Sequence, residues 1–375
     1  MAIEIKKVVT NSDLMKFIKS QWLFYKDDPN FVPPIIADRK KLLSREKNPF
    51  FKHSEMQEFL AYENGQIVGR IAAIKNDNHN ITHNDKVGFF GFFESINNQD
   101  VANKLFDACK EWLLERGLDT MRGPVDPSLN DECGLLIEGF ELPPVVLMKY
   151  NPPYYIDLIK NYGFDEAMLL YAYILKMENY QSEKLIRMQN IVRERYKIKV
   201  RNLDFKDKKK LMEDIRIIKG LYNDAWEKNW GFVKATNEEF DVLADDLIQI
   251  ADPNLVLIVE VNGKVAGFAL ALPDINEVLI HNKSGSLLGA AWHLFTKSKK
   301  IKTLRIITLG ILPEFRKTGA DAVLYYEIGE RGRKRGITQG EASWILSINN
   351  EMNNALQQAM KGQIYKKYMI YDKKL

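Results

Sequence analysis

Residues 309–324 have the sequence LGILPEFRKTGADAVL, which predicts a strand, a basic turn and a helix in succession. A buried-strand pattern gives way to a short basic turn, and a helical pattern begins after Gly319. The N–H groups of such a turn and the positive end of the helix dipole favour an anion, above all a phosphate group. Gly319 allows a ligand to approach the backbone closely. Arg316 and Lys317 add positive charge, and Thr318 adds a hydroxyl group.

The strand before the turn is predicted to offer a backbone edge to the same ligand. Pro313 ends this strand, so the edge at Leu309 and Ile311 stays available for pairing. An extended chain that contains amides, such as the pantetheine arm of coenzyme A, can pair there as an extra strand. The alternative is an ordinary connection between a strand and a helix, with no ligand.

The turn resembles the pyrophosphate-binding turn of the GCN5-related N-acetyltransferase (GNAT) superfamily, whose pattern is Arg/Gln-x-x-Gly-x-Gly/Ala. Residues 316–320, Arg-Lys-Thr-Gly-Ala, match the first five positions, and Asp321 departs from the sixth. The resemblance implies an acyl-CoA co-substrate that binds at Leu309, Ile311, Arg316, Lys317, Thr318, Gly319 and Ala320. Asp321 either weakens that binding or faces away from the phosphates as a residue of the first helical turn.

The resemblance extends beyond the turn. The segment GEASWILSINNEMNNALQQAMKG, residues 340–362, is similar to the fifth strand and fourth helix of the superfamily. This similarity implies that Asn350 contacts the coenzyme, with Asn353 and Asn354 as alternatives.

Acid–base groups are expected near the same place. The tyrosine that serves as general acid in the superfamily has no obvious counterpart here, and Tyr365 and Tyr368 are the nearest phenols. We predict Tyr365 as a catalytic residue. Glu341 shares one face of a strand with Ser343 beside the predicted cofactor cleft, which makes it the preferred general base. The alternative for Glu341 is a carboxylate that only faces solvent.

The two halves of the chain show a similar order of elements. YENGQIVGRIAAI in the first half and VEVNGKVAGFALA in the second both predict a hairpin with an Asn-Gly turn. We therefore expect an α/β fold with a mixed sheet, built from two tandem GNAT-like domains, unless the two hairpins are alike by chance. The predicted boundaries are 1–177 for the first domain, 178–196 for a connecting helix and 197–375 for the second domain. The first domain lacks the turn and is expected to keep the fold without the cofactor.

A segment rich in glycine, proline, asparagine and aspartate spans residues 122–155. This composition between apolar runs is typical of an ordered functional loop. Four adjacent residues are predicted to bind an amine substrate or accept its proton, with the aspartate as a catalytic candidate: Asn130, Asp131, Glu132 and Cys133. The alternative is a structural Ω-loop held by turns at Asp126 and Asn130.

Motifs along nearly the whole chain, among them DPNFVPP, RGPVDPSLNDECGLL and GEASWIL, resemble a bacterial family of tandem acyltransferase-fold proteins that includes ceramide synthases. The resemblance implies an N-acyltransferase that moves an acyl group from acyl-CoA or an acyl carrier protein to an amine. A long-chain amino lipid is one candidate for that amine. The alternatives are a non-catalytic acyl-CoA-binding or scaffold protein and a transferase that uses aminoacyl-tRNA.

Composition limits the class of protein. A length of 375 residues, with 46% apolar and 28% charged residues, is typical of a globular protein of two domains. The net charge of +4 does not favour nucleic-acid binding. Cys109 and Cys133 lie far apart in the sequence, as expected in a reducing cytoplasm. We therefore expect a soluble, cytoplasmic protein.

Residues 285–305 combine an apolar stretch that contains Trp292 with a lysine-rich end. This pattern predicts either a peripheral segment on an anionic membrane or an amphipathic helix packed on the second domain. The lysines are also candidates for docking an acyl carrier protein: Lys297, Lys299, Lys300 and Lys302.

No metal cofactor is expected. His79 and His83 have the spacing of a helical metal site, but the surrounding asparagine and aspartate residues favour a polar loop. The sequence contains no CxxC or HExxH motif.

Overall fold

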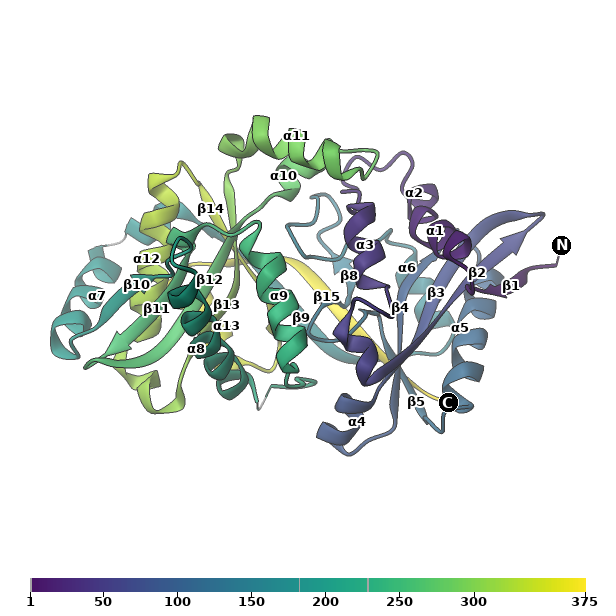
Figure 1. Cartoon of the computed structure of the whole chain (residues 1–375), viewed down its shortest axis with the longest axis horizontal. Helices are drawn as coiled ribbons and strands as arrows, with labels where there is room; N and C mark the ends of the chain where they lie inside the picture. Colours follow the sequence, from purple (N-terminus) through teal and green to yellow (C-terminus); the bar gives the residue numbers. More distant parts are fainter. Residues whose placement is uncertain (1, 182, 228) are drawn as a thin grey trace. The chain divides into compact units, whose positions relative to one another are not determined.

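The computed structural model describes residues 2–181, 183–227 and 229–375 (Figure 1). The chain forms two compact units. Unit 1 contains residues 1–170, 278–297 and 366–375, and unit 2 contains residues 171–277 and 298–365. The domain boundaries predicted from the sequence, 1–177, 178–196 and 197–375, stay a prediction.

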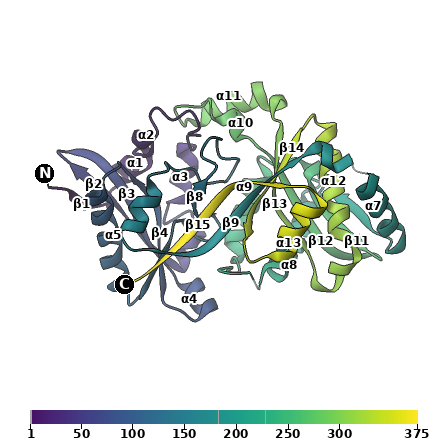
Figure 2. The ribbon, with the colours of Figure 1, turned by 180° about the vertical axis from the view of Figure 1, so that it is seen from behind.

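Unit 1 is built on a mixed sheet. Its strands are β1 (Glu4–Lys7), β2 (Ser54–Glu63), β3 (Gln66–Asn76), β4 (Val87–Ser95), β5 (Thr120–Gly123) and β8 (Leu135–Glu138), with a small separate hairpin of β6 (Val125–Asp126) and β7 (Glu132–Cys133). The last strand, β15 (Gln363–Lys374), is yellow in Figure 2 and pairs antiparallel with β5 and β8. The helices are α1 (Asn11–Lys19), α2 (Gln21–Phe24), α3 (Ile36–Leu42), α4 (Asp77–His83), α5 (Gln99–Leu114), α6 (Tyr155–Asn161) and α11 (Leu287–Lys297).

Helix α5 closes the core of unit 1. Its apolar residues recur every three or four positions, so Val101, Leu105 and Phe106 are buried against the sheet. The ring of Phe106 stacks on that of Phe93, with ring centroids 4.8 Å apart.

Unit 2 repeats this plan. Its strands are β10 (Lys199–Asn202), β11 (Val256–Val261), β12 (Lys264–Pro273), β13 (Thr303–Ile311) and β14 (Gln339–Leu346), and β9 (Asp165–Lys176), whose residues 171–176 belong to this unit, lies beside β14. The helices are α7 (Glu183–Arg195), α8 (Lys208–Trp226), α9 (Asn237–Ile248), α12 (Ala320–Lys334) and α13 (Asn350–Asn354), and α10 (Asn276–Leu279) begins at its edge. The apolar face of α8 packs on the sheet through Leu221, which contacts a cluster containing Ile258 and Phe268.

The two units share details that support the predicted duplication. Both hairpins turn at an Asn-Gly pair in which both residues have positive φ, at Asn64–Gly65 and Asn262–Gly263. Both pairs of hairpin strands shift register close to that turn, and the pairing of the next strand shifts again, β3 with β4 and β12 with β13. In each unit a parallel pair follows, β4 with β5 and β13 with β14. The prediction of two tandem GNAT-like domains with a mixed sheet is thus confirmed.

Three local predictions need correction or addition. Residues 11–13, Asn-Ser-Asp, predict the N-cap of the first helix, but Thr10 caps α1 in a capping box with Asp13, so Asn11 is the first residue of the helix. The segment with His79 and His83 is a helix and not a polar loop, because the Asn76 side chain caps it by accepting the N–H of His79. Helix α9, which begins with the capping box of Thr236 and Glu239, was not predicted.

Candidate functional site

Strands β13 and β14 of unit 2 separate after four residue pairs. Their parallel pairing covers Thr303–Ile306 of β13, and β12 pairs with the other edge of β13 as far as Ile311. The register of β12 and β13 shifts between Leu270 and Ala271, which leaves Ile307 as a bulge. Among the described residues, no strand pairs with the second edge of β13 from Ile307 to Ile311. The predicted contacts at Leu309 and Ile311 lie on this stretch.

The basic turn follows immediately. A 3₁₀ helix spans Pro313–Thr318, and Gly319 with φ of 76° begins α12 without a side-chain cap. The Thr318 hydroxyl donates to the carbonyl of Phe315 at 2.7 Å, and the side chain of Arg316 is exposed. Lys317 is exposed as well, whereas Ala320 is buried. The turn therefore presents two cationic side chains and a helix N-terminus on one short segment.

Asp321 lies at this helix N-terminus. Burial raises the pKa of its carboxyl group, and the N–H groups of Ala322 and of Asp321 itself oppose that rise as hydrogen-bond donors. The carboxyl group therefore lies beside backbone N–H groups of the first turn of α12, and its effect on cofactor binding stays a prediction. It also competes for backbone donors of the kind that a phosphate would use.

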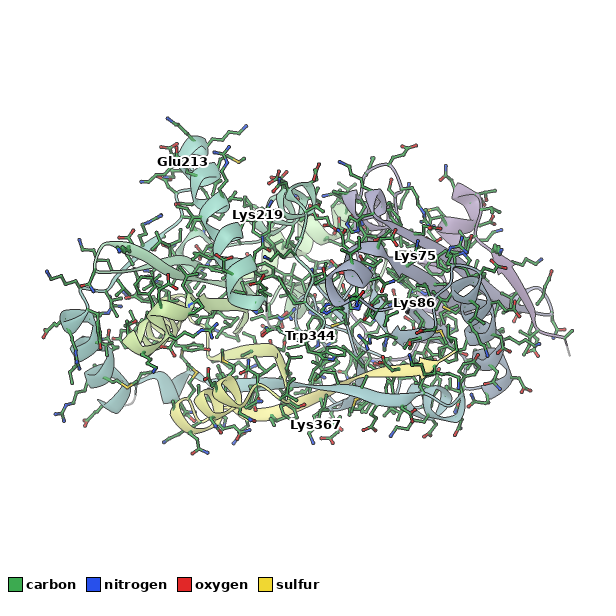
Figure 3. All side chains as sticks on the ribbon, turned by 90° about the horizontal axis from the view of Figure 1, so that it is seen from below. Lys75, Lys86, Glu213, Lys219, Trp344 and Lys367 are labelled. Atoms are coloured by element: carbon green, nitrogen blue, oxygen red, sulfur yellow. The ribbon has the colours of Figure 1, made fainter. Side chains whose placement is uncertain are left out.

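Glu341 and Tyr365, two separately predicted catalytic residues, meet in unit 2. The Tyr365 hydroxyl donates to Oε1 of Glu341 at 3.4 Å, and Glu341 is fully buried on β14. Arg305 of β13 lies across from it, with Nε 3.6 Å from Oε2 of Glu341. The guanidinium of Arg305 also lies over the ring of Trp344, which is labelled in Figure 3, at 5.2 Å from its centroid.

Arg305 was not among the residues predicted from the sequence. Its signal is an arginine inside the apolar strand sequence TLRIITLGI, at a position that is only 3% exposed. A buried cation requires a partner. Glu341, which lies opposite Arg305 on the neighbouring strand β14, is that partner. The alternative of a solvent-facing Glu341 is therefore wrong.

The asparagines of α13 have different environments. Asn350 is exposed as the first residue of the helix. Asn353 is buried, where its amide donates to the carbonyls of Leu346 and Ser347 at 3.0 and 3.2 Å and its carbonyl accepts the Tyr173 hydroxyl at 2.8 Å. Asn353 thus fixes the connection between β14 and α13, and the role of Asn350 stays a prediction.

The predicted amine-binding residues belong to unit 1. Asn130 and Asp131 are exposed, and the Ser128 hydroxyl donates to Asp131 at 2.6 Å. Glu132 accepts two hydrogen bonds from Arg39, at 2.9 and 3.1 Å, and Cys133 is buried. The loop is therefore held by ion pairs, and the predicted substrate contacts stay predictions.

In unit 1, residues of the unit itself occupy the positions that correspond to the edge of β13 and the N-terminus of α12 in unit 2. Asp126 of β6 lies against β4 and accepts the Phe92 N–H at 2.7 Å, while its other oxygen pairs with Lys149. A Cβ atom at Gly91 would overlap the carbonyl oxygen of Val125. The N-terminus of α5 is likewise capped by its own chain, because the Asn98 side chain accepts the N–H of Asp100 at 2.9 Å.

A buried network of polar side chains also lies in unit 1. It was not predicted, because its members are far apart in the sequence. Glu94 accepts the hydroxyls of Tyr25 and Tyr155, both at 2.8 Å, and pairs with Arg70 at 3.4 Å. Burial raises the pKa of the Glu94 carboxyl group, against the opposing effect of Arg70. These contacts join β3, β4, α6 and Tyr25, the residue that follows α2, within the unit.

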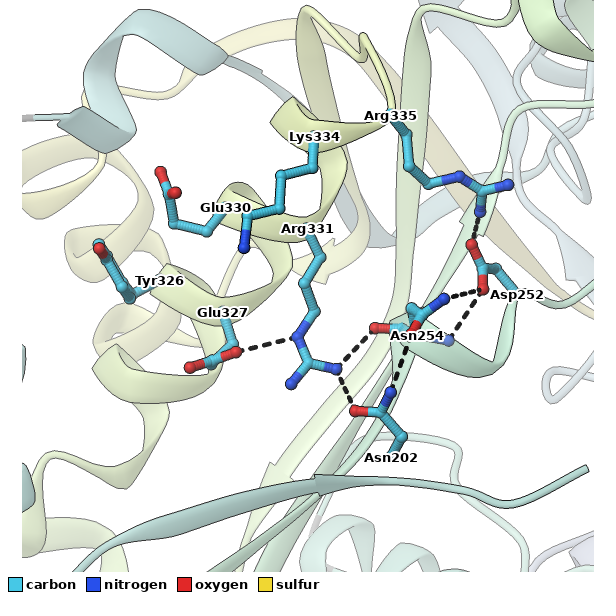
Figure 4. A pocket seen from close by; sticks show the side chains of 9 residues that line it. All are labelled: Asn202, Asp252, Asn254, Tyr326, Glu327, Glu330, Arg331, Lys334 and Arg335. Carbon is cyan, nitrogen blue, oxygen red and sulfur yellow. Dashed lines mark hydrogen bonds and ion pairs between the residues drawn. The ribbon is translucent and has the colours of Figure 1, made fainter.

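A cavity of about 750 Å³ lies in unit 2 along the C-terminal half of α12 (Figure 4). Two of its cationic side chains are paired, since Arg331 bonds Glu327 at 2.9 Å and Arg335 pairs with Asp252. None of the predicted site residues lines it.

Two further features bear on cofactors and membranes. The rings of His79 and His83 lie 4.5 Å apart, and burial lowers the pKa of His79 to about 3. No cluster of three or more potential metal ligands occurs in residues 2–181, 183–227 and 229–375. Across those same ranges, none of the helices is both apolar and long enough to span a bilayer.

Comparisons with known proteins agree with this architecture. No protein-family model matches the chain. A tandem GNAT protein from the clavulanic acid biosynthesis pathway superposes with a TM-score of 0.56 over 100% of this chain and 98% of that chain, at 10% identity. This similarity concerns the fold.

Two relatives are similar in sequence over their full length. Protein YghO of Escherichia coli K12 is 31% identical over 379 residues, which cover 99% of this chain and 95% of that protein. The bacterial ceramide synthase of Caulobacter vibrioides is 32% identical over 387 residues, which cover 100% of this chain and 98% of that protein. The chain therefore belongs to the tandem GNAT-fold acyltransferase family that includes these two proteins.

Proposed function

We propose that unit 2 binds an acyl thioester and transfers its acyl group to an amine. The observation that carries the proposal is the edge of β13 from Ile307 to Ile311, with which no strand of the described residues pairs and which leads into the basic turn at 316–319. Arg316 of this turn donates from Nε to the carbonyl of Ile311 at 3.5 Å. A pantetheine arm would pair with this edge, and its phosphates would lie at the turn. The same two positions in unit 1 are filled by Asp126 and Asn98.

The chemistry needs no covalent enzyme intermediate. The amine nitrogen attacks the thioester carbonyl, a C–N bond forms and the C–S bond breaks. The thiolate takes up a proton while the attacking nitrogen loses one. Backbone N–H groups at the separation of β13 and β14 would polarise the carbonyl, and the Tyr365 hydroxyl, held by Glu341, would protonate the leaving sulfur.

We propose a long-chain amino lipid as the acceptor and a fatty acyl thioester as the donor. Support comes from the relative named as a ceramide synthase, which matches the whole chain at 32% identity. Coenzyme A and an acyl carrier protein present the same pantetheine arm, so both fit the edge of β13.

The first test is a series of thermal melts with free, acetyl-, octanoyl- and palmitoyl-CoA. A ligand at about 100 times its Kd stabilises the folded state by about 2.7 kcal/mol. The double variant Arg316→Glu, Lys317→Glu should lose this shift, because both side chains are exposed and the reversed charge repels phosphates. The control Lys208→Glu, Lys209→Glu makes the same change of charge at the N-terminus of α8 and should keep the shift. If no thioester shifts the wild type, coenzyme A is not the donor, and an acylated carrier protein is tested next.

Turnover is measured by mass spectrometry of the amide formed from palmitoyl-CoA and a long-chain amino base. Tyr365→Phe should lower kcat by about 100- to 10,000-fold, the usual contribution of a general acid. The palmitoyl-CoA melting shift of this variant should be unchanged.

A non-catalytic acyl-CoA-binding protein is the second candidate. It is favoured by the Asp321 carboxyl group, which competes for donors at the turn, and by Glu341, whose charge is already matched by Arg305. Thioester binding without an amide product, across a panel of amines, would favour this candidate.

A further inference from the structure

Helix α11 of unit 1 carries an apolar face whose side chains are exposed in the part of the chain that the structure describes. Four large side chains on it are exposed: Leu287 (58%), Leu288 (85%), Trp292 (66%) and Phe295 (86%). At 100° per residue, these positions and Ala291 occupy one side of the helix. Exposed apolar side chains that are contiguous mark a binding surface, whereas single ones do not.

The opposite side of α11 is fixed to unit 1. Ala290 is buried, and the turn before the helix is held by the Asn282 amide, which donates to the carbonyl of Ser286 at 2.9 Å. The Trp22 indole donates to the carbonyl of Lys283 at 2.8 Å, and the Ile36 N–H donates to that of Gly285 at 2.9 Å. The exposed face is therefore presented by an anchored helix, labelled in Figure 1.

The chain segment that contains the helix carries charge of one sign. The sequence contains no acidic residue between Glu277 and Glu314. Lysines lie at both ends of α11: Lys283 before it, and Lys297, Lys299, Lys300 and Lys302 at and after its end. The apolar face and its flanking lysines together match the two layers of an anionic bilayer surface, acyl chains below and headgroups above.

We propose that α11 docks this face into the surface of an anionic lipid bilayer, with Leu288, Trp292 and Phe295 in the acyl region. A surface for a carrier protein requires the lysines but not four exposed apolar side chains. A protein–protein interface is depleted in lysine, which argues against a second copy of this chain. The proposal does not rest on the proposed function, because it concerns binding and not catalysis.

The test is flotation of the full-length protein with vesicles of phosphatidylcholine alone or with about one quarter phosphatidylglycerol. Binding to the anionic vesicles is expected, and it should weaken as salt rises. Leu288→Ser, Phe295→Ser should reduce partitioning about tenfold or more, because both side chains leave the acyl region. Lys299→Glu, Lys300→Glu should reduce binding to anionic vesicles only.

The matched control is Val9→Ser, Ile81→Ser, which removes two apolar side chains of unit 1 that are 80% and 78% exposed. This control should float like the wild type, and all variants should keep the wild-type Tm because the substituted side chains are exposed. No flotation at low salt would overturn the proposal, as would flotation unchanged in Leu288→Ser, Phe295→Ser. Dimerisation lost in that variant, or binding of acyl carrier protein in place of vesicles, would overturn it too.

Discussion

Units 1 and 2 share one arrangement of strands but differ at the edge where the two parallel strands separate. Both have an Asn-Gly hairpin, a register shift in the following strand and a short parallel pair that separates. In unit 1 the separation of β4 and β5 is occupied by β6, and Asn98 caps the helix that follows. In unit 2 the edge of β13 has no partner strand among the described residues, and the helix begins at Gly319 without a side-chain cap. In unit 1 the chain itself makes the hydrogen bonds that, on the proposed function, unit 2 would leave to a ligand.

The largest expected effect comes from removing the Asp126 carboxylate, which occupies the edge of β4 in unit 1. Asp126→Ala should cost about 3–5 kcal/mol of unfolding free energy, because it removes the buried carboxylate that pairs with the half-buried Lys149 and accepts the Phe92 N–H. Denaturant titration measures the loss. Glu166→Ala, which removes an exposed pair with Lys160, is the control and should change stability by less than about 0.5 kcal/mol. Equal losses in the two variants would contradict a structural role for Asp126.

Gly91→Ala tests how closely β6 packs against the edge of β4. The added methyl group would overlap the carbonyl oxygen of Val125, so we expect a loss of about 1–3 kcal/mol. Gly65→Ala is not a fair control because Gly65 has φ of 77°. Gly220→Ala is suitable, since its Cβ would meet no atom within 4 Å, and this helical substitution should stabilise the protein slightly.

Asn98→Ala should cost about 1 kcal/mol, the usual value of a lost helix cap. The exposed N–H groups of α5 would then resemble those of α12. Addition of inorganic phosphate should not restore the lost stability, because residues 94–103 contain no lysine or arginine. Recovery of the full loss in phosphate would mean that unit 1 keeps a phosphate site.

The smallest effect is a pH dependence at Asp321. The pKa of its carboxyl group is raised in the folded state, so its favourable contribution is present below the unfolded pKa near 3.8. That contribution is lost as pH rises through the folded pKa. Asp321→Asn should therefore raise Tm at pH 7 by less than about 3 °C and leave it unchanged at pH 3. A larger shift with palmitoyl-CoA in this variant would sharpen the contrast between the two units.

Local signals in the sequence predicted the parts of the fold that local chemistry determines. Asn64–Gly65 and Asn262–Gly263 adopt the hairpin turns expected of them, and Asp207, a favoured N-cap residue type, caps α8. The turn at Gly319 lies between a strand and a helix, also as predicted. Each of these depends on neighbouring residues alone.

The rest depends on contacts between residues far apart in the chain. Arg305, Glu341 and Tyr365 come from three strands, so only the folded sheet brings them together. No local signal tells which unit receives the last strand, yet Tyr371 pairs with Gly123 in unit 1. The helix at His79 was missed because asparagine and aspartate disfavour helix interiors, while Asn76 at the cap favours the helix.

The most direct test of the central claim is amide hydrogen exchange, read by mass spectrometry with and without palmitoyl-CoA. We expect the thioester to slow amide exchange in peptides covering 307–320 of unit 2. The exchange rates of peptides covering 90–101 of unit 1 should stay unchanged. Protection of 90–101, or no protection of 307–320 under conditions where the ligand raises Tm, would contradict it.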